Sequence, residues 1–329
     1  MTELLGVFIE NLLSPPILFF LLGVISGLLK SNLEIPDQIS KYLAIYLMMA
    51  IGFKGGVVIS ETTNIDDKLI LTILAGIVSG FLQPFIGYFF LKRTTKIDSI
   101  TAAALAAHYG SVSLVTFVTA VNFLEINSII YSGYIVSVLT IMEAPAILSG
   151  LLIAYKFKQK TAKNNHQSGL CIIKEIFTNG SILLLLGSFF IGWLSGTKGM
   201  QKMDGFLVTP FQGILSLFLL DMGLLVTKHL IELREFNIKL AMFGIYMPLI
   251  GSIIGVALSS FIGLDLGTGF LFTVLISSAS YIAVTAAMRT TLPEAKATIY
   301  IPMTLAITFP FNITIGIPFY FALAQKFLT

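Results

Sequence analysis

Two short clusters of small and hydroxylated residues are the places in this sequence where chemistry is most readily built. They lie at residues 106–116 and 276–285, each in the middle of a long apolar run. Where a membrane helix is interrupted, free amide N–H groups can receive an anion, and carbonyl and hydroxyl oxygens can ligate a cation such as sodium. We therefore predict that these two clusters together form a site for an anion and a cation.

Small residues also have a simpler use in membrane proteins. They line packed interfaces, because short side chains let two helices approach closely. A packing role for any one of these serines therefore stays open. The occurrence of two such clusters at corresponding places in the two halves of the chain favours a binding site near the middle of the membrane.

Ionisable side chains within apolar runs are costly to bury and indicate a cavity or a partner. Glu143, two residues before Pro145, either contacts a coupling ion or bonds the backbone that the proline frees. Asp221 allows the same two interpretations. Lys54 can reach the membrane surface along its own side chain. His108 can either tune a response to pH or serve the packing of the helices.

Composition indicates that the membrane is the solvent of this chain. Of its 329 residues, 56% are hydrophobic and only 11% are charged, against roughly a quarter charged in an average soluble domain. Apolar runs of about 20 residues, long enough to cross the hydrocarbon core as helices, recur along the sequence. They are continuously apolar rather than alternating, which disfavours a β-barrel. We predict an all-α membrane protein.

Ten apolar runs are long enough to be transmembrane helices, five on each side of a polar linker at residues 158–175. The first lacks the basic start of a secretory signal and is interpreted as a retained span. The predicted spans are residues 13–29, 39–59, 69–91, 100–123, 129–157, 176–194, 207–226, 238–262, 266–288 and 299–327.

The loops between these spans differ strongly in charge. If they alternate between the two sides, fifteen of the 20 Lys and Arg residues fall on one face and four on the other, with Lys54 inside the second span. Basic residues concentrate in cytoplasmic loops, so the face with fifteen is expected in the cytoplasm. Both termini and the less basic loops are then expected on the extracytoplasmic side. One missed span would mix the two sets, so the asymmetry also supports ten spans.

The two halves, residues 1–157 and 176–329, carry matching motifs in the same order. The matches include Gly52 with Gly223, Pro84 to Gly87 with Pro248 to Gly251, Ser111 with Ser280, Thr116 with Thr285, and Glu143 with Asn312. Because each half has an odd number of spans, the second half enters the membrane from the opposite side, and the repeat is inverted. Such repeats are typical of secondary transporters that work by alternating access.

Other classes of function lack the residues that they require. Cys171 is the only cysteine and the three histidines are scattered, so we predict no resident metal. The basic residues lie in loops rather than in a stripe suited to nucleic acid. No nucleophile with a base, paired intramembrane acids, P-loop or channel filter is present. We therefore predict neither an enzyme nor an organic cofactor.

At the two serine clusters the sequence resembles the sodium-dependent bicarbonate symporter family, whose founding members serve carbon concentration in cyanobacteria. The resemblance spans nearly the whole chain. The segments that carry it are Ile51-Gly52 with Gly55-Gly56, Gly110 to Ser113, Glu143 to Ala146, Ser278 to Ile282 followed by Arg289, and Gly316 to Phe319.

The resemblance implies a specific architecture. A gate domain would consist of helices 1, 2, 6 and 7, and a core domain of helices 3, 4, 5, 8, 9 and 10, with helices four and nine interrupted. Bicarbonate would bind between the halves of these two helices, with sodium nearby. By position, the resemblance places the substrate contacts at Gly110, Ser111, Ser113, Ser278 and Ser280. The resemblance also implies a homotrimer in the bacterial inner membrane and a cytosolic PII-like protein as a candidate regulator.

The sequence departs from the family pattern in the second cluster. Tyr281 stands where the cyanobacterial transporters carry an aspartate, and Val284 and Ala286 replace a glycine and a proline. A proton could therefore replace sodium as the coupling ion, and another small anion or short carboxylate could replace bicarbonate. The residues that we predict to contact the coupling ion are Thr116, Glu143, Tyr281, Thr285 and Asn312.

Overall fold

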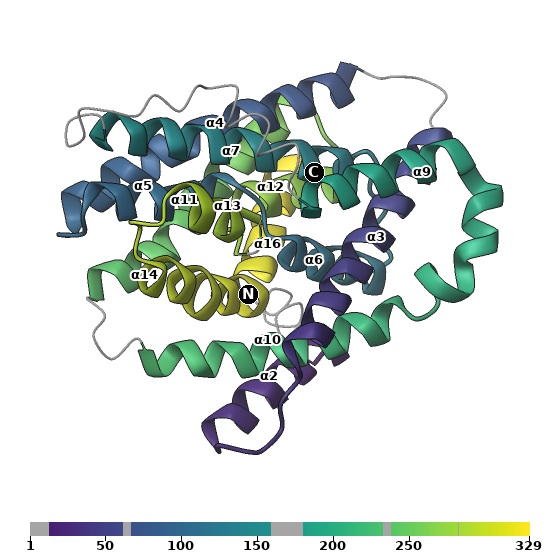
Figure 1. Ribbon diagram of the computed structural model, residues 1–329. Helices are drawn as coiled ribbons and strands as arrows, with labels where there is room; N and C mark the ends of the chain where they lie inside the picture. The colour runs from purple at the N-terminus through teal and green to yellow at the C-terminus, as the bar shows by residue number, and fades with distance from the viewer. Residues whose placement is uncertain (1–12, 62–66, 159–179, 233–237, 282) are drawn as a thin grey trace.

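The computed structural model describes residues 13–61, 67–158, 180–232, 238–281 and 283–329, and within these ranges all regular secondary structure is helical (Figure 1). The all-α prediction is therefore confirmed. The first half contains α2 (Pro15–Leu28), α3 (Asp37–Glu61), α4 (Asp67–Thr94), α5 (Ser99–Gly110), α6 (Leu114–Ile126) and α7 (Ile135–Lys158). The predicted linker at residues 158–175 lies outside the described residues, apart from the last residue of α7.

The second half begins with α9 (Gly180–Met203), a π-helical turn η1 (Asp204–Val208), α10 (Phe211–Glu232) and α11 (Ile238–Ile262). It continues with α12 (Leu266–Ile276) and α13 (Ala283–Thr291). The last segment consists of α14 (Ala297–Pro302), η3 (Met303–Thr308), α15 (Phe309–Phe311), η4 (Asn312–Gly316) and α16 (Ile317–Leu328). Its two π-helical turns follow Pro302 and precede Pro318, as expected where proline removes a backbone donor.

Several helices have the length and composition of membrane spans. Six candidate spans lie among the described residues: Asp67–Thr94, Ser99–Ile126, Ile135–Phe157, Phe211–Lys228, Ile238–Ile262 and Ala297–Leu328. Helices α2 and α12 are apolar but shorter. A multi-pass membrane protein is thus supported, whereas the count of ten spans and their inverted order stay predictions.

The predicted interruptions of helices four and nine are both present. Residues 111–113 separate α5 from α6, and residues 277–281 follow α12 before α13 begins at Ala283. Helices α5 and α12 also begin with the same kind of N-terminal cap. Asp98 accepts a hydrogen bond from the Thr101 N–H at 2.8 Å, and Asp265 accepts one from the Thr268 N–H at 2.9 Å. Such carboxylate caps satisfy amides that a helix start leaves free.

Helix α5 is buried along most of its length and positions the first interruption. Every residue from Thr101 to Gly110 is buried. It packs against α4 and α7, and α4 and α7 also lie side by side along one edge of the molecule (Figure 1). The alanines at 102–104, 106 and 107 keep this helix narrow, so that its neighbours approach its backbone closely.

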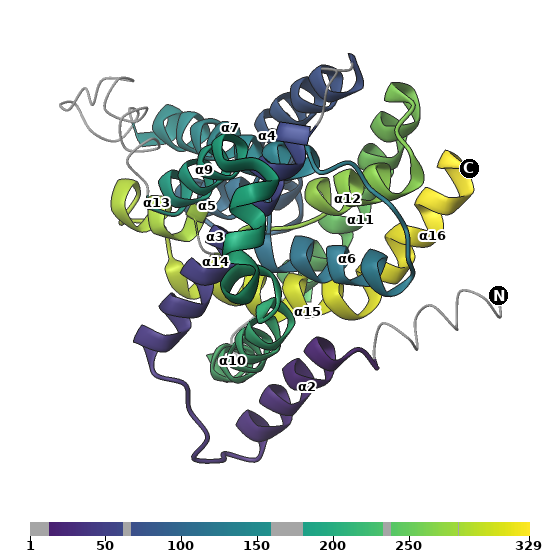
Figure 2. The ribbon, with the colours of Figure 1, turned by 90° about the vertical axis from the view of Figure 1, so that its right-hand side faces the viewer.

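Two pairs of helices cross at glycines. Helix α2 packs on α10, where Gly23 faces Gly223, and α3 packs on α9, where Gly56 lies against the backbone of α9 and Gly192 against that of α3 (Figure 2). Gly56 thus contacts α9 as Gly223 contacts α2, whereas the match of Gly52 with Gly223 stays a prediction. A side chain at any of these four positions would meet backbone atoms of the partner helix.

We expect Gly223→Ala to lower the thermal stability of the protein. A Cβ there would collide with the Phe20 carbonyl of α2, and overpacking of this kind typically destabilises by about 1–3 kcal/mol. Gly213→Ala is the matched control, because no atom lies within 4 Å of a Cβ at that position of α10. Melting temperatures of the purified proteins in detergent provide the measurement. Equal melting temperatures for the two variants would contradict this account of the crossing.

Candidate binding site

The two interruptions lie against each other and are joined by backbone hydrogen bonds. The Ser113 N–H donates to the Ser278 hydroxyl oxygen at 2.8 Å. The Ser280 N–H donates to the His108 carbonyl oxygen at 2.9 Å. Residues more than 160 positions apart are thus brought together, as expected if both serine clusters contribute to one site.

The hydroxyls of the predicted serines do not all have the same role. Ser113 accepts hydrogen bonds from the N–H and the hydroxyl of Thr116, at 3.2 and 2.9 Å, and thereby caps α6. Ser278 also donates to the Leu275 carbonyl at 2.9 Å, at the end of α12. Ser280 accepts a longer bond of 3.4 Å from the Val284 N–H. In the structure these three hydroxyls hold the interruptions together.

Ser111 is the exception among the predicted serines. Its side chain is 1% exposed, and its hydroxyl has no hydrogen-bond partner in the described part of the chain. The backbone N–H of Val115, in the first turn of α6, also has no partner among the described residues. An unpaired hydroxyl and an unpaired amide at a helix N-terminus are donors suited to an anion.

Gly110 marks the point where α5 touches α4. A Cβ at this position would lie 2.5 Å from the ring of Pro84 and 2.7 Å from the Gly80 carbonyl oxygen. The glycine therefore permits a close helix contact immediately before the first interruption. The contact of Gly110 with a substrate stays a prediction.

His108 connects the two interruptions through its side chain. Its Nδ1 lies 2.6 Å from the Ala104 carbonyl oxygen and its Nε2 lies 3.2 Å from the Thr285 hydroxyl. Because a carbonyl only accepts, Nδ1 carries the hydrogen, and Nε2 of the neutral ring accepts from Thr285. The ring also packs on Tyr300, at 4.8 Å between centroids. His108 thus ties α5 to α13.

The end of α12 is capped by two amide side chains, one of which the sequence interpretation missed. Gln83 of α4 donates to the Ile276 carbonyl at 2.8 Å. Asn312 donates to the Ser277 carbonyl at 3.1 Å and accepts from the Tyr320 hydroxyl at 2.7 Å. Carbonyls at a helix C-terminus lack partners within the helix, so these bonds stabilise the interruption. Gln83 carried no sequence signal beyond its place inside an apolar run.

Glu143 lies on α7 close to the first interruption. A Cβ at Gly80 would lie 3.2 Å from the carbonyl of Met142 and 3.3 Å from that of Gly110, so this part of α7 is next to the end of α5. Glu143 is 7% exposed, and no hydrogen bond or ion pair of the described residues reaches its carboxylate. The expected bond to backbone freed by Pro145 is not present among them.

Tyr281 fills part of the second interruption with an aromatic ring. The ring packs on Phe309, with 5.4 Å between centroids. Its buried hydroxyl lies near the Ser113 hydroxyl without the geometry of a hydrogen bond, and it has no partner in the described residues. Tyr281 thus adds a second unpaired hydroxyl beside the two serine clusters.

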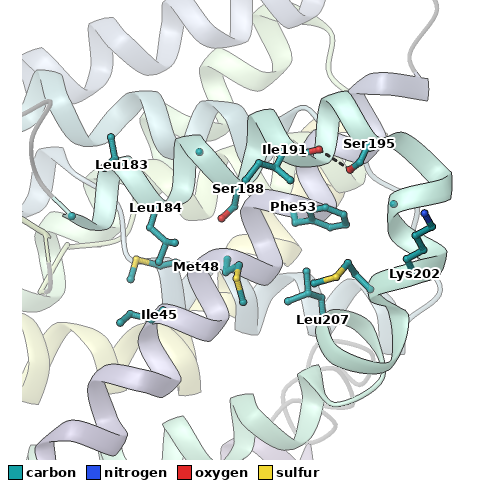
Figure 3. Close-up of a pocket in the computed structure, with 15 residues that line it drawn as sticks. Ile45, Met48, Phe53, Leu183, Leu184, Ser188, Ile191, Ser195, Lys202 and Leu207 are labelled. Atoms are coloured by element: carbon teal, nitrogen blue, oxygen red, sulfur yellow. Dashed lines mark hydrogen bonds between the residues drawn. The ribbon is translucent and has the colours of Figure 1, made fainter.

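A separate cavity of about 1150 Å³ lies between α3 and α9 and contains none of the predicted site residues (Figure 3). Apolar side chains such as Ile45, Met48 and Leu183 line it. The Ser195 hydroxyl donates to the Ile191 carbonyl at 2.6 Å, and Lys202 lies at one end. This mostly apolar lining suits an apolar ligand.

No cluster of three or more His, Cys, Asp or Glu side chains that could hold a metal ion occurs in the described residues. Two interrupted helices that meet in an all-helical membrane protein are typical of secondary transporters. The chain belongs to the Na⁺-dependent bicarbonate transporter superfamily, whose family model matches residues 15–325. No curated protein matches the chain.

Proposed function

We propose that this protein imports bicarbonate together with sodium by alternating access. The observation that carries the proposal is the meeting of the two interruptions around the unpaired Ser111 hydroxyl. Membership of the Na⁺-dependent bicarbonate transporter superfamily supports the choice of anion and ion. No enzymatic step and no organic cofactor form part of the proposal.

In the proposed site the anion binds at the N-terminal end of α6. The Ser111 hydroxyl and the Val115 N–H donate to it, and the helix dipole favours its negative charge. Ser113 and Ser278, with their bond of 2.8 Å, hold the two interruptions at the distance that the anion requires. Gly110 and Ser280 complete the set of residues next to the anion.

Sodium binds beside the anion in this proposal. Hydroxyl oxygens of Thr116, Tyr281 and Thr285 lie at the interruptions, and Glu143 brings a carboxylate without a partner in the described residues to the adjacent part of α7. A nearby cation would offset the cost of a buried negative charge. Asn312 contributes to the proposed sodium site through the hydrogen bond that it donates to the Ser277 carbonyl.

The proposed motion separates two groups of helices. Helices α2, α3, α9 and α10 form the gate and the remaining helices form the core, which agrees with the close pairing of α2 with α10 and of α3 with α9. An inverted repeat would give two related conformations, each open to one side. We further propose a homotrimer in the bacterial inner membrane with both termini outside, and a cytosolic PII-like protein as its regulator.

Uptake of radiolabelled bicarbonate into proteoliposomes tests this function. With an inward sodium gradient we expect accumulation, and with a matched potassium gradient we expect none. A protonophore control separates sodium coupling from proton coupling. Folded protein that accumulates no bicarbonate under either gradient would reject the proposed substrate.

A short carboxylate is the second candidate substrate, because Tyr281 occupies an interruption where the family carries an aspartate. An anion site built from backbone amides and hydroxyls selects by size and geometry. Competition of unlabelled acetate and formate against labelled bicarbonate distinguishes the candidates. Stronger competition by a carboxylate than by bicarbonate itself would favour the second candidate.

We expect Glu143→Gln to weaken the coupling to sodium while the fold is retained. The substitution keeps the shape of the side chain and removes its charge, and no hydrogen bond among the described residues depends on it. Loss of one charged ligand should raise the sodium concentration for half-maximal uptake about tenfold or more. Uptake measured against sodium concentration gives this value. An unchanged value would show that Glu143 does not contact the coupling ion.

A further inference from the structure

Gln83 of α4 has one end of its side-chain amide engaged and the other end free. Its Nε2 atom donates a hydrogen bond of 2.8 Å to the Ile276 carbonyl, whereas its Oε1 atom has no hydrogen-bond partner in the described residues. Because a carbonyl oxygen only accepts, the nitrogen must face Ile276 and the free end must be the oxygen. The side chain is 2% exposed, so this acceptor is buried. A buried acceptor without a donor is costly, which indicates that a donor binds there.

Helix α4 contacts both interruptions through two consecutive residues. A Cβ at Gly110, immediately before the first interruption, would lie 2.5 Å from the ring of Pro84. Gln83 reaches Ile276, which is the last residue of α12 and immediately precedes the second interruption. The two interruptions are themselves joined by hydrogen bonds. The side chain with the free amide oxygen therefore lies where the two interruptions come together.

A cap on α12 explains only half of this amide. In the predicted repeat Pro84 matches Pro248, so Gln83 matches Met247 of α11. Met247 is 1% exposed and apolar. The corresponding place in the second half of the chain is thus filled by packing, without an amide. Capping by the Gln83 nitrogen also leaves the oxygen unpaired, which favours a second use for this side chain.

An acceptor next to an anion site restricts which anion fits. Bicarbonate carries an O–H group as well as a negative charge, so it can donate to the Gln83 Oε1 atom while it accepts from the Ser111 hydroxyl. Acetate has the same carboxylate with a methyl group in place of that O–H group. A methyl group cannot donate, so bound acetate would leave the Gln83 oxygen buried and unpaired.

We propose that Gln83 selects bicarbonate by accepting a hydrogen bond from the O–H group of the bound anion. The inference rests on the proposed function and assigns to its site the residue that distinguishes bicarbonate from a carboxylate. A site built to bond a substrate hydroxyl rejects analogues without one, because its own polar group is then left unpaired. Gln83 thus contacts the substrate through Oε1 and holds the end of α12 through Nε2.

The test compares the binding of bicarbonate and of acetate to the purified full-length protein in detergent, in sodium buffer at constant pH and ionic strength. Each affinity is obtained from the rise in melting temperature with anion concentration, because a ligand that binds the folded state stabilises it. We expect the unmodified protein to bind bicarbonate about 10-fold to 100-fold more tightly than acetate.

Gln83→Met introduces the residue type that Met247 has in the second half. We expect it to weaken bicarbonate binding about tenfold or more and to change acetate binding little, so that most of the preference is lost. Ser79→Ala, one turn earlier on α4, is the matched control. The Ser79 hydroxyl is buried and donates to the Gly76 carbonyl of its own helix, so the preference should be retained.

The ratio of the two affinities separates selection from a purely structural role. Loss of a cap that serves only the fold would weaken both anions by the same factor, so an unchanged ratio in Gln83→Met would overturn the inference and leave the proposed function intact. If Gln83→Met does not fold, Gln83→Asn takes its place, because its shorter amide cannot reach both partners and its ratio should also fall. Failure of the unmodified protein to bind bicarbonate would instead reject the proposed substrate, and the inference with it.

Discussion

Ser111→Ala will lower the efficiency of bicarbonate uptake by about 10-fold to 100-fold without destabilising the protein. The Ser111 hydroxyl has no partner in the described structure, so its removal breaks no bond that holds the fold. If it donates to the anion, the loss corresponds to a hydrogen bond to a charged group, worth about 1.5–3 kcal/mol. The measurement is kcat/KM for sodium-driven uptake into proteoliposomes, together with the melting temperature.

Ser149→Ala is the control for Ser111→Ala. Ser149 is also a fully buried serine, but its hydroxyl already donates to the Ala146 carbonyl of its own helix α7. We expect its uptake to remain near that of the unmodified protein. Ser111→Phe, which fills the proposed anion position, should abolish uptake. Normal uptake by Ser111→Ala and Ser111→Phe would remove the first interruption from the binding site.

Local features of the sequence were enough to locate the interruptions. Gly110 and Ser111, and then Ser277 to Ser280, follow apolar stretches that contain few residues able to end a helix. The serines at these places favour local hydrogen bonds over a continuous helix. Apolar length and composition likewise sufficed for the helical class. These properties depend on neighbours in the sequence, which is why they could be predicted.

Contacts between distant helices could not be predicted in this way. Gln83 caps α12 from 193 positions away, and its sequence context resembles that of any polar residue inside a span. The Nε2 atom of His108 likewise lies 3.2 Å from the Thr285 hydroxyl, 177 positions along the chain. Matching motifs suggested the repeat, but no motif indicated the close approach of Gly56 to the Phe189 carbonyl of α9.

Asn312 shows how one residue type supports two interpretations. Its match with Glu143 in the repeat predicted contact with the coupling ion. In the structure both ends of its amide are engaged, by the Ser277 carbonyl at 3.1 Å and by the Tyr320 hydroxyl at 2.7 Å. A direct contact with the ion would need one of these bonds to be shared or broken. Its role in coupling stays a prediction, and the two interpretations lead to opposite results on mutation.

Asn312→Leu is therefore expected to destabilise the protein strongly. The Ser277 carbonyl and the Tyr320 hydroxyl would both remain buried without their present partner, and each such group costs about 1–3 kcal/mol. We expect a total loss of about 2–5 kcal/mol, seen as a lower melting temperature in sodium and in potassium alike. Tyr320→Phe, which removes only one of the two bonds, should lose about 1 kcal/mol.

Asn312→Asp separates the structural role from a direct ion contact. An aspartate still accepts from Tyr320, but its second oxygen would face the Ser277 carbonyl oxygen, where the asparagine now donates. A structural role therefore predicts a lower melting temperature and no gain in sodium affinity. A residue that contacts sodium would instead bind the ion more tightly once it carries a negative charge. A higher sodium affinity with unchanged stability would thus assign Asn312 to the ion, because a cap on α12 has no means to produce it.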